Sequence, residues 1–297
     1  MSSFPSPNPA TQPMQGLVWQ IDDTEAFREQ LHSWLAGNWH SEQSVRQWWA
    51  HLAREGLTTP TWGRPYGGLG ARTAIQQVVE DGLADLSAIG PPLDGAGVRM
   101  VGPALRQHAT MPQALRLLAG VLMGTQAWCE LVDEADTDVR DLTTRAVRTA
   151  AGWRLEGTKT STRIADVAER ALVIARTDPN SRGTKGLSCF VVSVHADDVH
   201  VHATGHATGH ATGQAGDQAG ERRTVVLDGA LVGHDDLVGT LHEGWAVART
   251  IIAHSEMSLA GRIRRGVITL MPGERAGFLD RSVADVLGTH TPNPRRP

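Results

Sequence analysis

Apolar residues recur every three or four positions over the first 120 residues, which is the spacing of amphipathic helices. Phe27, Leu31 and Leu35 follow a pair of aspartates, Asp22 and Asp23, either of which is a favourable helix N-cap. A second stripe consists of Val45, Trp48, Trp49 and Leu52 and stops at Gly56, a typical C-terminal cap residue. Two further helical segments follow, 71–86 and 97–123. The first part of the chain is therefore predicted to be all helical.

The pattern changes near Thr125 to short segments rich in Val, Ile, Leu, Thr and Trp, separated by Gly, Asp, Asn and Pro. Such segments are typical of β-strands. The predicted strands are 143–150, 153–160, 171–177, 187–194 and 223–228. Ala151 and Gly152 form a plausible hairpin turn between the first two. From about Leu241 helical spacing returns, with Trp245, Ala248, Ile251, Ile252 and Leu259 on roughly one side.

These patterns predict an α+β protein with three folded regions. The predicted divisions are a disordered tail (1–16), an N-terminal helical domain (17–123), a central β domain (124–238) containing a low-complexity His/Gly loop (200–220), a C-terminal helical region (239–290) and a second disordered tail (291–297). The two tails are rich in Pro and polar residues, which do not form a packed core. We expect the C-terminal helix to lack packing partners for four apolar residues and so to favour oligomerisation; these are Trp245, Ile251, Ile252 and Leu259.

Composition excludes several classes of function. The net charge of −4 and the scattered arginines give no basic surface for nucleic acid. No apolar run approaches the ~18 residues that cross a bilayer, and the N-terminal tail lacks the basic start and apolar centre of a signal peptide. Cys129 and Cys189 both lie in apolar runs, which favours buried free thiols and a cytoplasmic protein over a disulfide.

A tetrapeptide, His-Ala-Thr-Gly, occurs three times between His202 and Gly213. Together with His195 and His200 it could bind a divalent metal, because neutral imidazoles are good zinc ligands. However, glycine at every fourth position opposes a helix that would align the histidines, and no carboxylates recur with them. We therefore interpret the repeat as a surface loop and assign no metal site.

The segment from Trp128 to Asp138 reads W-C-E-L-V-D-E-A-D-T-D. It resembles the acyl-CoA dehydrogenase motif W-C-Q-x-F-S-E-P-G-A-G-S-D, a flavin-binding strand and loop. Trp128, Cys129, Glu134 and the pair Thr137-Asp138 match. Two residues are missing after Glu134, the glycines are absent, and Asp133 replaces a small hydroxyl residue. An acidic side chain beside a pyrophosphate repels it.

Other fragments of the same family, in particular its actinobacterial members, follow in order along the chain. They are 57–70, similar to W-P-x-E-Y-G-G-x-G; 100–105; 157–159 with 165–168, which frame a second flavin strand; 175–178; 185–192; and 244–248. Gly67-Gly68-Leu69-Gly70 lacks the strand and helix of a dinucleotide fingerprint and is interpreted as a structural turn. The resemblance implies the family's fold, with a C-terminal helical region shorter than the family's bundle.

The resemblance also implies a reaction and a cofactor. Family members remove an α-proton and a β-hydride from an acyl-CoA thioester and pass the electrons to FAD, in fatty acid or sterol side-chain β-oxidation. Carried onto this chain, the cofactor contacts are Val132, Asp133, Thr137, Ser161, Thr162 and Arg163. Ser161 stands where the family has an aromatic residue against the flavin, so a stacking surface is lost. Arg163 replaces a small hydroxyl residue.

The catalytic base is not identified by the sequence. The family's alternative position for its glutamate, counted from Gly244-Trp245, falls on Ser255, and Glu256 follows it. One residue is about 100° around a helix, so the candidate base Glu256 should point away from the required direction. Two hypotheses therefore remain: a flavoenzyme acting on an acyl-CoA, or a catalytically inactive homologue that serves as a structural or regulatory subunit of a full-length acyl-CoA dehydrogenase, as a homo-oligomer or hetero-oligomer.

Overall fold

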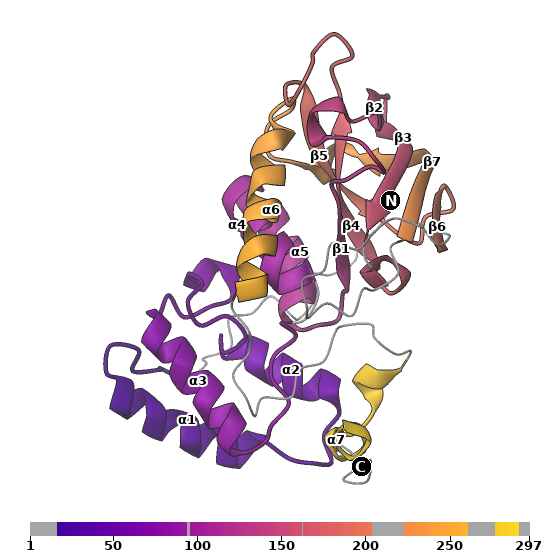
Figure 1. The fold of residues 1–297 in the computed structure, drawn as a ribbon. Coiled ribbons are helices and arrows are strands. Elements are labelled where there is room, and N and C mark those ends of the chain that lie inside the picture. The colour runs from indigo at the N-terminus through magenta and orange to yellow at the C-terminus, as the bar shows by residue number, and fades with distance from the viewer. Residues whose placement is uncertain (1–16, 94–95, 162, 204–222, 261–276, 291–297) are drawn as a thin grey trace, which may run out of the picture.

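The computed structural model describes residues 17–93, 96–161, 163–203, 223–260 and 277–290. Three helices form the base of the molecule: α1 (Thr24–Asn38), α2 (Val45–Arg54) and α3 (Thr73–Asp85) (Figure 1). The Asp23 carboxylate accepts hydrogen bonds from the amides of Glu25 and Ala26, and Ser44 caps α2 through Gln47. The predicted stripes on α1 and α2 are buried in one core with Ile75 and Leu83 of α3.

The predicted helical segment 97–123 is divided into three pieces. A π-helical turn, η3 (Gly97–Val101), leads into α4 (Gly102–His108), and α5 (Met111–Leu122) follows after a break. The break has a local cause, because Thr110 caps α5 and Pro112 lies in its first turn, where proline is tolerated.

The strands form one mixed sheet of eight among the described residues. They are β1 (Trp128–Leu131), β2 (Arg145–Arg148), β3 (Gly152–Ser161), β4 (Arg170–Arg176), β5 (Leu187–Ser193), β6 (Val199–Ala203), β7 (Arg223–Gly233) and β8 (Leu237–Val238). Their order is β6-β7-β3-β2-β4-β5-β8, with β1 parallel to β4. β2 and β3 form a hairpin as predicted, with Ala151 in its turn and Gly152 as the first residue of β3.

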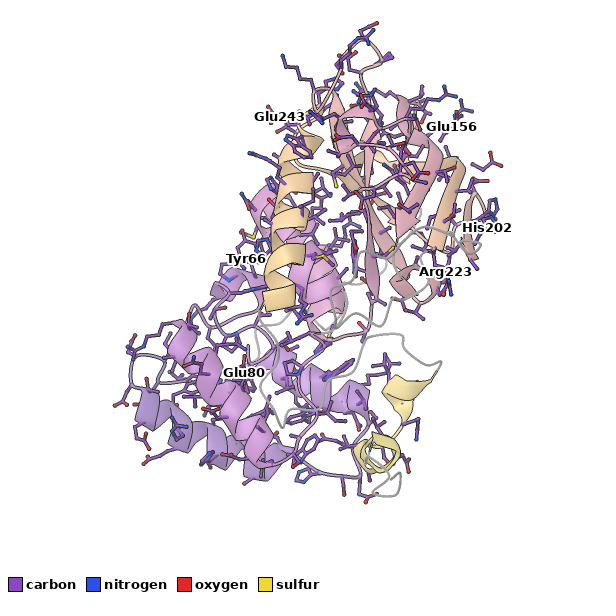
Figure 2. All side chains as sticks on the ribbon, viewed as in Figure 1. Tyr66, Glu80, Glu156, His202, Arg223 and Glu243 are labelled. Atoms are coloured by element: carbon purple, nitrogen blue, oxygen red, sulfur yellow. The ribbon has the colours of Figure 1, made fainter. Side chains whose placement is uncertain are left out.

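One strand lies where the sequence predicted a loop. Residues 200–203 belong to β6, which pairs with β7 through His200↔Val226 and His202↔Thr224. Figure 2 shows His202 and Arg223 at this outer edge of the sheet. The first histidine of the repeat is therefore part of a strand, and the remainder of the repeat lies outside the described residues.

Helix α6 (Gly244–Ala260) lies beside α4 and against the sheet (Figure 1). Val247, Ala248 and Ile251 are buried, while Trp245 and Ile252 are partly buried against the same core. The expectation of an exposed apolar stripe was therefore wrong for Trp245, Ile251 and Ile252, because α4, η3 and β5 cover them. The side chain of Leu259, which belongs to the same expectation, lies outside the described residues.

After the gap at 261–276, η7 (Phe278–Asp280) and α7 (Val283–His290) return to the N-terminal helices. The Val283 amide donates to the Gln43 carbonyl, and Arg46 pairs with Asp280 at 2.8 Å. None of the described helices has the length and apolar character needed to cross a bilayer.

Candidate functional site

Strand β1 lies between two cores because alternate side chains of a strand point to opposite faces. Cys129 and Leu131 pack inside the curved sheet, whereas Trp128 and Val132 pack toward α4, α5 and α6. Val132 is the first flavin contact implied by the resemblance, so the candidate site lies on the helix-facing side of β1. Asp133 follows it and is exposed.

Glu134 has a structural role that the motif does not reveal. It is buried, and its carboxylate accepts hydrogen bonds from the Thr143 amide (2.8 Å), the Thr143 hydroxyl (2.7 Å) and the Thr144 amide (2.8 Å). It also accepts from Lys159 Nζ at 3.2 Å, and this fully buried amine donates to the Val132 carbonyl at 3.1 Å. The ion pair connects the loop after β1 to β3, and the hydrogen bonds from Thr143 and Thr144 connect it to the start of β2.

The environment keeps both members of the pair charged at neutral pH. Burial alone would raise the pKa of Glu134, but hydrogen bonds from Thr143 and Thr144 and the charge of Lys159 outweigh burial and hold it at about 2. Burial lowers the pKa of Lys159 to about 8, against the opposing effect of Glu134. A depressed carboxyl pKa adds stability above its unfolded value of 4.5, and this contribution is lost as the pH falls toward 2.

The loop from residue 133 to 141 is acidic, and several of its polar groups form hydrogen bonds with one another. Thr137 donates its amide to the Glu134 carbonyl, and the Asp138 side chain accepts from the Arg140 amide and guanidinium. Thr137 thus lies in the loop, with its hydroxyl donated to the Ala135 carbonyl at 3.0 Å. Apart from the buried Glu134, the loop exposes four carboxylates: Asp133, Asp136, Asp138 and Asp141.

This loop does not fit a flavin pyrophosphate. Arg140 is its single cation, and it is already paired with Asp138 at 2.9 Å. Asp136 occupies a left-handed backbone conformation (φ 55°) without glycine, so the loop carries a Cβ where a glycine would leave its backbone open. The amides of Thr137, Arg140 and Asp141 are used within the loop.

The second predicted group of flavin contacts lies at the end of β3. The Thr160 amide donates to the Asp133 carbonyl at 3.0 Å, so the structure brings the two predicted segments together. Ser161 is the last residue of β3, and the backbone of Arg163 begins η5 (Arg163–Asp166). The side chains of Ser161 and Arg163, and all of Thr162, lie outside the described residues.

The candidate base Glu256 lies in the second half of α6. Its side chain is outside the described residues, so its assignment stays a prediction.

Sequence reasoning missed Glu130, which points to the same face of β1 as Trp128 and Val132. Its Oε2 and the Trp128 Nε1 are both enclosed without a hydrogen-bond partner among the described residues. Burial raises the pKa of Glu130 to about 7, and the charge of Asp133 adds to this, while a hydrogen bond from its own backbone opposes it. The sequence contained an indication of this, because Glu130 stands where the family motif has an uncharged glutamine.

We expect Glu130→Gln to stabilise the protein at pH 8 by about 3 kcal/mol and to leave its stability at pH 4.5 nearly unchanged. The raised pKa means that the folded state holds the proton more tightly than the unfolded state. The stabilising contribution is therefore complete below about pH 4.5 and is lost as the pH rises through about 7. Urea unfolding of both proteins from pH 4.5 to 8 measures this. Parallel stability curves for the two proteins would contradict it.

Comparison with known proteins agrees with this geometry. Residues 126–220 match the family described as acyl-CoA dehydrogenase, middle domain. The acyl-CoA dehydrogenase FadE34 of Mycobacterium tuberculosis is 31% identical over 70% of this chain, and the acyl-CoA dehydrogenase IpdE1 of the same organism is 28% identical over 84%. This chain spans 28% of the length of FadE34 and 65% of that of IpdE1.

Solved structures show the same fold. The Tcur3481-Tcur3483 steroid ACAD G363A variant has a TM-score of 0.60 and 25% identity, covering 80% of this chain and 63% of that chain. The ChsE4-ChsE5 complex from Mycobacterium tuberculosis has a TM-score of 0.57 and 19% identity, covering 84% and 69%. The expected α+β architecture is thereby confirmed. The ordered motifs, the sheet topology and these similarities identify residues 126–220 as an acyl-CoA dehydrogenase middle domain within a chain of acyl-CoA dehydrogenase-like fold.

Proposed function

We propose that this chain is a catalytically inactive subunit of an acyl-CoA dehydrogenase-type assembly, in which a full-length homologue supplies the flavin-binding loop and the catalytic base. The observation that carries the proposal is the acidic, self-bonded loop at 133–141, which opposes a bound pyrophosphate. The buried ion pair between Glu134 and Lys159 holds that loop against β3 and does not require a flavin to do so. A subunit of this kind keeps the family's fold and its surfaces but not its redox chemistry.

Two related structures support a partner of this type. The name of the steroid ACAD Tcur3481-Tcur3483 joins two components, and the ChsE4-ChsE5 structure is that of a complex. By extension we propose a hetero-oligomer with a full-length homologue for this chain, with a homo-oligomer as the alternative arrangement. In either arrangement the ligand of the assembly is an acyl-CoA.

A second candidate function is a self-sufficient flavoprotein that oxidises an acyl-CoA with FAD, with Glu256 as its base. The middle-domain match and the retained β1 scaffold favour it. When bound, FAD would accept the hydride from the acyl β-carbon. Val132, Asp133 and Thr137 would be its neighbours in this chain. The exposed carboxylates of the loop argue against this candidate.

Co-expression with full-length family members from the same organism tests the proposal. We expect size-exclusion chromatography with light scattering to show a stable complex with one of them, with flavin bound by the partner. The partner expressed alone is the control. A chain that stays separate from every homologue and oxidises an acyl-CoA by itself would show that the second candidate is correct.

A further inference from the structure

Arg106 of α4 is held over two aromatic rings. Its guanidinium carbon lies 4.6 Å from the centroid of the Trp62 ring and 5.4 Å from that of Tyr66. Trp62 is buried, and Tyr66 ends the short helix η2 (Arg64–Tyr66). Figure 2 shows Tyr66 beside the lower part of α6, at the edge of the helical layer. Cation–π contacts of this kind fix the plane of a guanidinium.

Two glycines allow Trp62 to approach α4 and the chain to turn beneath it. A Cβ on Gly102 would lie 2.3 Å from Trp62 Cη2, so only glycine admits the indole at that position. Gly102 and Arg106 are four residues apart and share a face of α4, which places both under the same ring. A Cβ on Gly68 would lie 2.2 Å from the Trp62 carbonyl oxygen. The close contacts at Gly68 and at Gly102 of α4 therefore both help to fix the position of Arg106 relative to Trp62.

The guanidinium has no anionic partner among the described residues. Its Nε is enclosed and donates to no acceptor there. The helices around it, η2, η3, α4 and the described side chains of α6, contain no Asp or Glu. Burial lowers the pKa of Arg106, which shows that its charge is partly desolvated. An enclosed donor without an acceptor is unfavourable, and an added acceptor would relieve that cost.

We propose that Arg106, Trp62 and Tyr66 form an oxyanion-binding site at the η2–α4 edge, which takes the carboxylate or phosphate group of a small-molecule ligand. The planar fork of arginine suits both groups, because two parallel N–H donors can meet two oxygens. The aromatic rings orient that fork and exclude water from one side of it. The cation–π contacts of Arg106 join α4 to Trp62 and η2 and involve no residue of the 133–141 loop, and the inference does not rest on the proposed function.

A second arginine provides a matched control. Arg148 of β2 lies 5.9 Å from the centroid of the Trp153 ring, but it is exposed and its Nε is not enclosed. Arg148→Gln removes one positive charge, as Arg106→Gln does, and one cation–π contact where Arg106→Gln removes two. General electrostatic effects of losing a cation are therefore equal in the two variants.

Titration of the full-length chain with inorganic phosphate and, separately, with acetate tests the site, with chloride holding the ionic strength constant. The readout is the side-chain Nε–H resonance of Arg106 by nitrogen-15 NMR. We expect a saturable shift of this resonance. The anion with the tighter binding identifies the ligand class as phosphate or carboxylate.

The variants separate this site from background binding. We expect Arg106→Gln to abolish the anion-dependent rise in melting temperature, and Arg106→Lys, which keeps the charge but loses the fork, to weaken anion affinity by about tenfold or more. Arg148→Gln should behave as wild type. If Arg106→Gln does not fold, the Lys variant gives the same comparison. The absence of a saturable shift with either anion, or an equal loss in the Arg148 variant, would overturn the proposal.

Discussion

We expect Glu134→Ala to lower the free energy of unfolding by about 3 to 5 kcal/mol. The substitution leaves the amine of Lys159 fully buried without its counter-ion, and it removes the acceptor for the Thr143 and Thr144 amides. A domain has a total stability of roughly 5 to 15 kcal/mol, so the loss is a large share. Urea unfolding followed by circular dichroism measures it.

Glu156→Gln is the control for this experiment. Glu156 forms a closer ion pair, 2.6 Å from Arg145, but it lies on the surface of β3, where solvent screens the charges and a pair adds little stability. Replacing both buried partners, as Glu134→Leu with Lys159→Met, should cost less than Glu134→Ala, since no charge is then left unpaired. A single variant that costs no more than Glu156→Gln would refute the structural role of Glu134.

Gly68→Ala is expected to be the second most damaging substitution, at about 2 to 3 kcal/mol. A Cβ there would approach the carbonyl oxygens of Trp62 and Thr59 to 2.2 and 2.4 Å, and both atoms belong to the backbone. The 59–68 turn must therefore shift, and Trp62 with it. Thermal unfolding monitored by tryptophan fluorescence reports both the stability and the displaced ring.

Gly70→Ala in the same motif is the matched control. Gly70 has a left-handed backbone (φ 70°), but no atom lies within 4 Å of the added Cβ. The cost should be only that of the conformation, about 1 kcal/mol. If the two alanine variants are equally stable, the close backbone approach at Gly68 is not what the motif requires.

Most of the fold could be predicted from periodicity because burial imposes it. The stripes on α1 and α2 follow helical spacing, and β4 and β5 are short apolar runs that are buried on both faces. Two errors have physical causes. Strand β6 reads Val-His-Val-His-Ala, an alternation typical of a strand, but its second histidine also begins the glycine-rich repeat, whose composition indicates a loop. The break between α4 and α5 comes from the capping by Thr110, which local periodicity does not detect.

The candidate site was harder to predict than the fold. As the motif match predicted, Val132, Asp133 and Thr137 follow β1, and their role as flavin contacts stays a prediction. The match counted Glu134 only as one identical residue among several. Its role depends on Lys159, 25 positions away, and this contact exists only in three dimensions. Glu130 was missed because a strand glutamate reads as a solvated residue until the packing of α4 to α6 against β1 is known.

The flavin content of the chain purified alone tests the central claim most directly. Absorbance in the visible flavin bands, with release of bound flavin by denaturation, gives the number of flavins per chain. We predict a nearly colourless protein with well under about one flavin per ten chains, because the four exposed carboxylates of the 133–141 loop repel a pyrophosphate. A yellow protein with one flavin per chain would contradict the account.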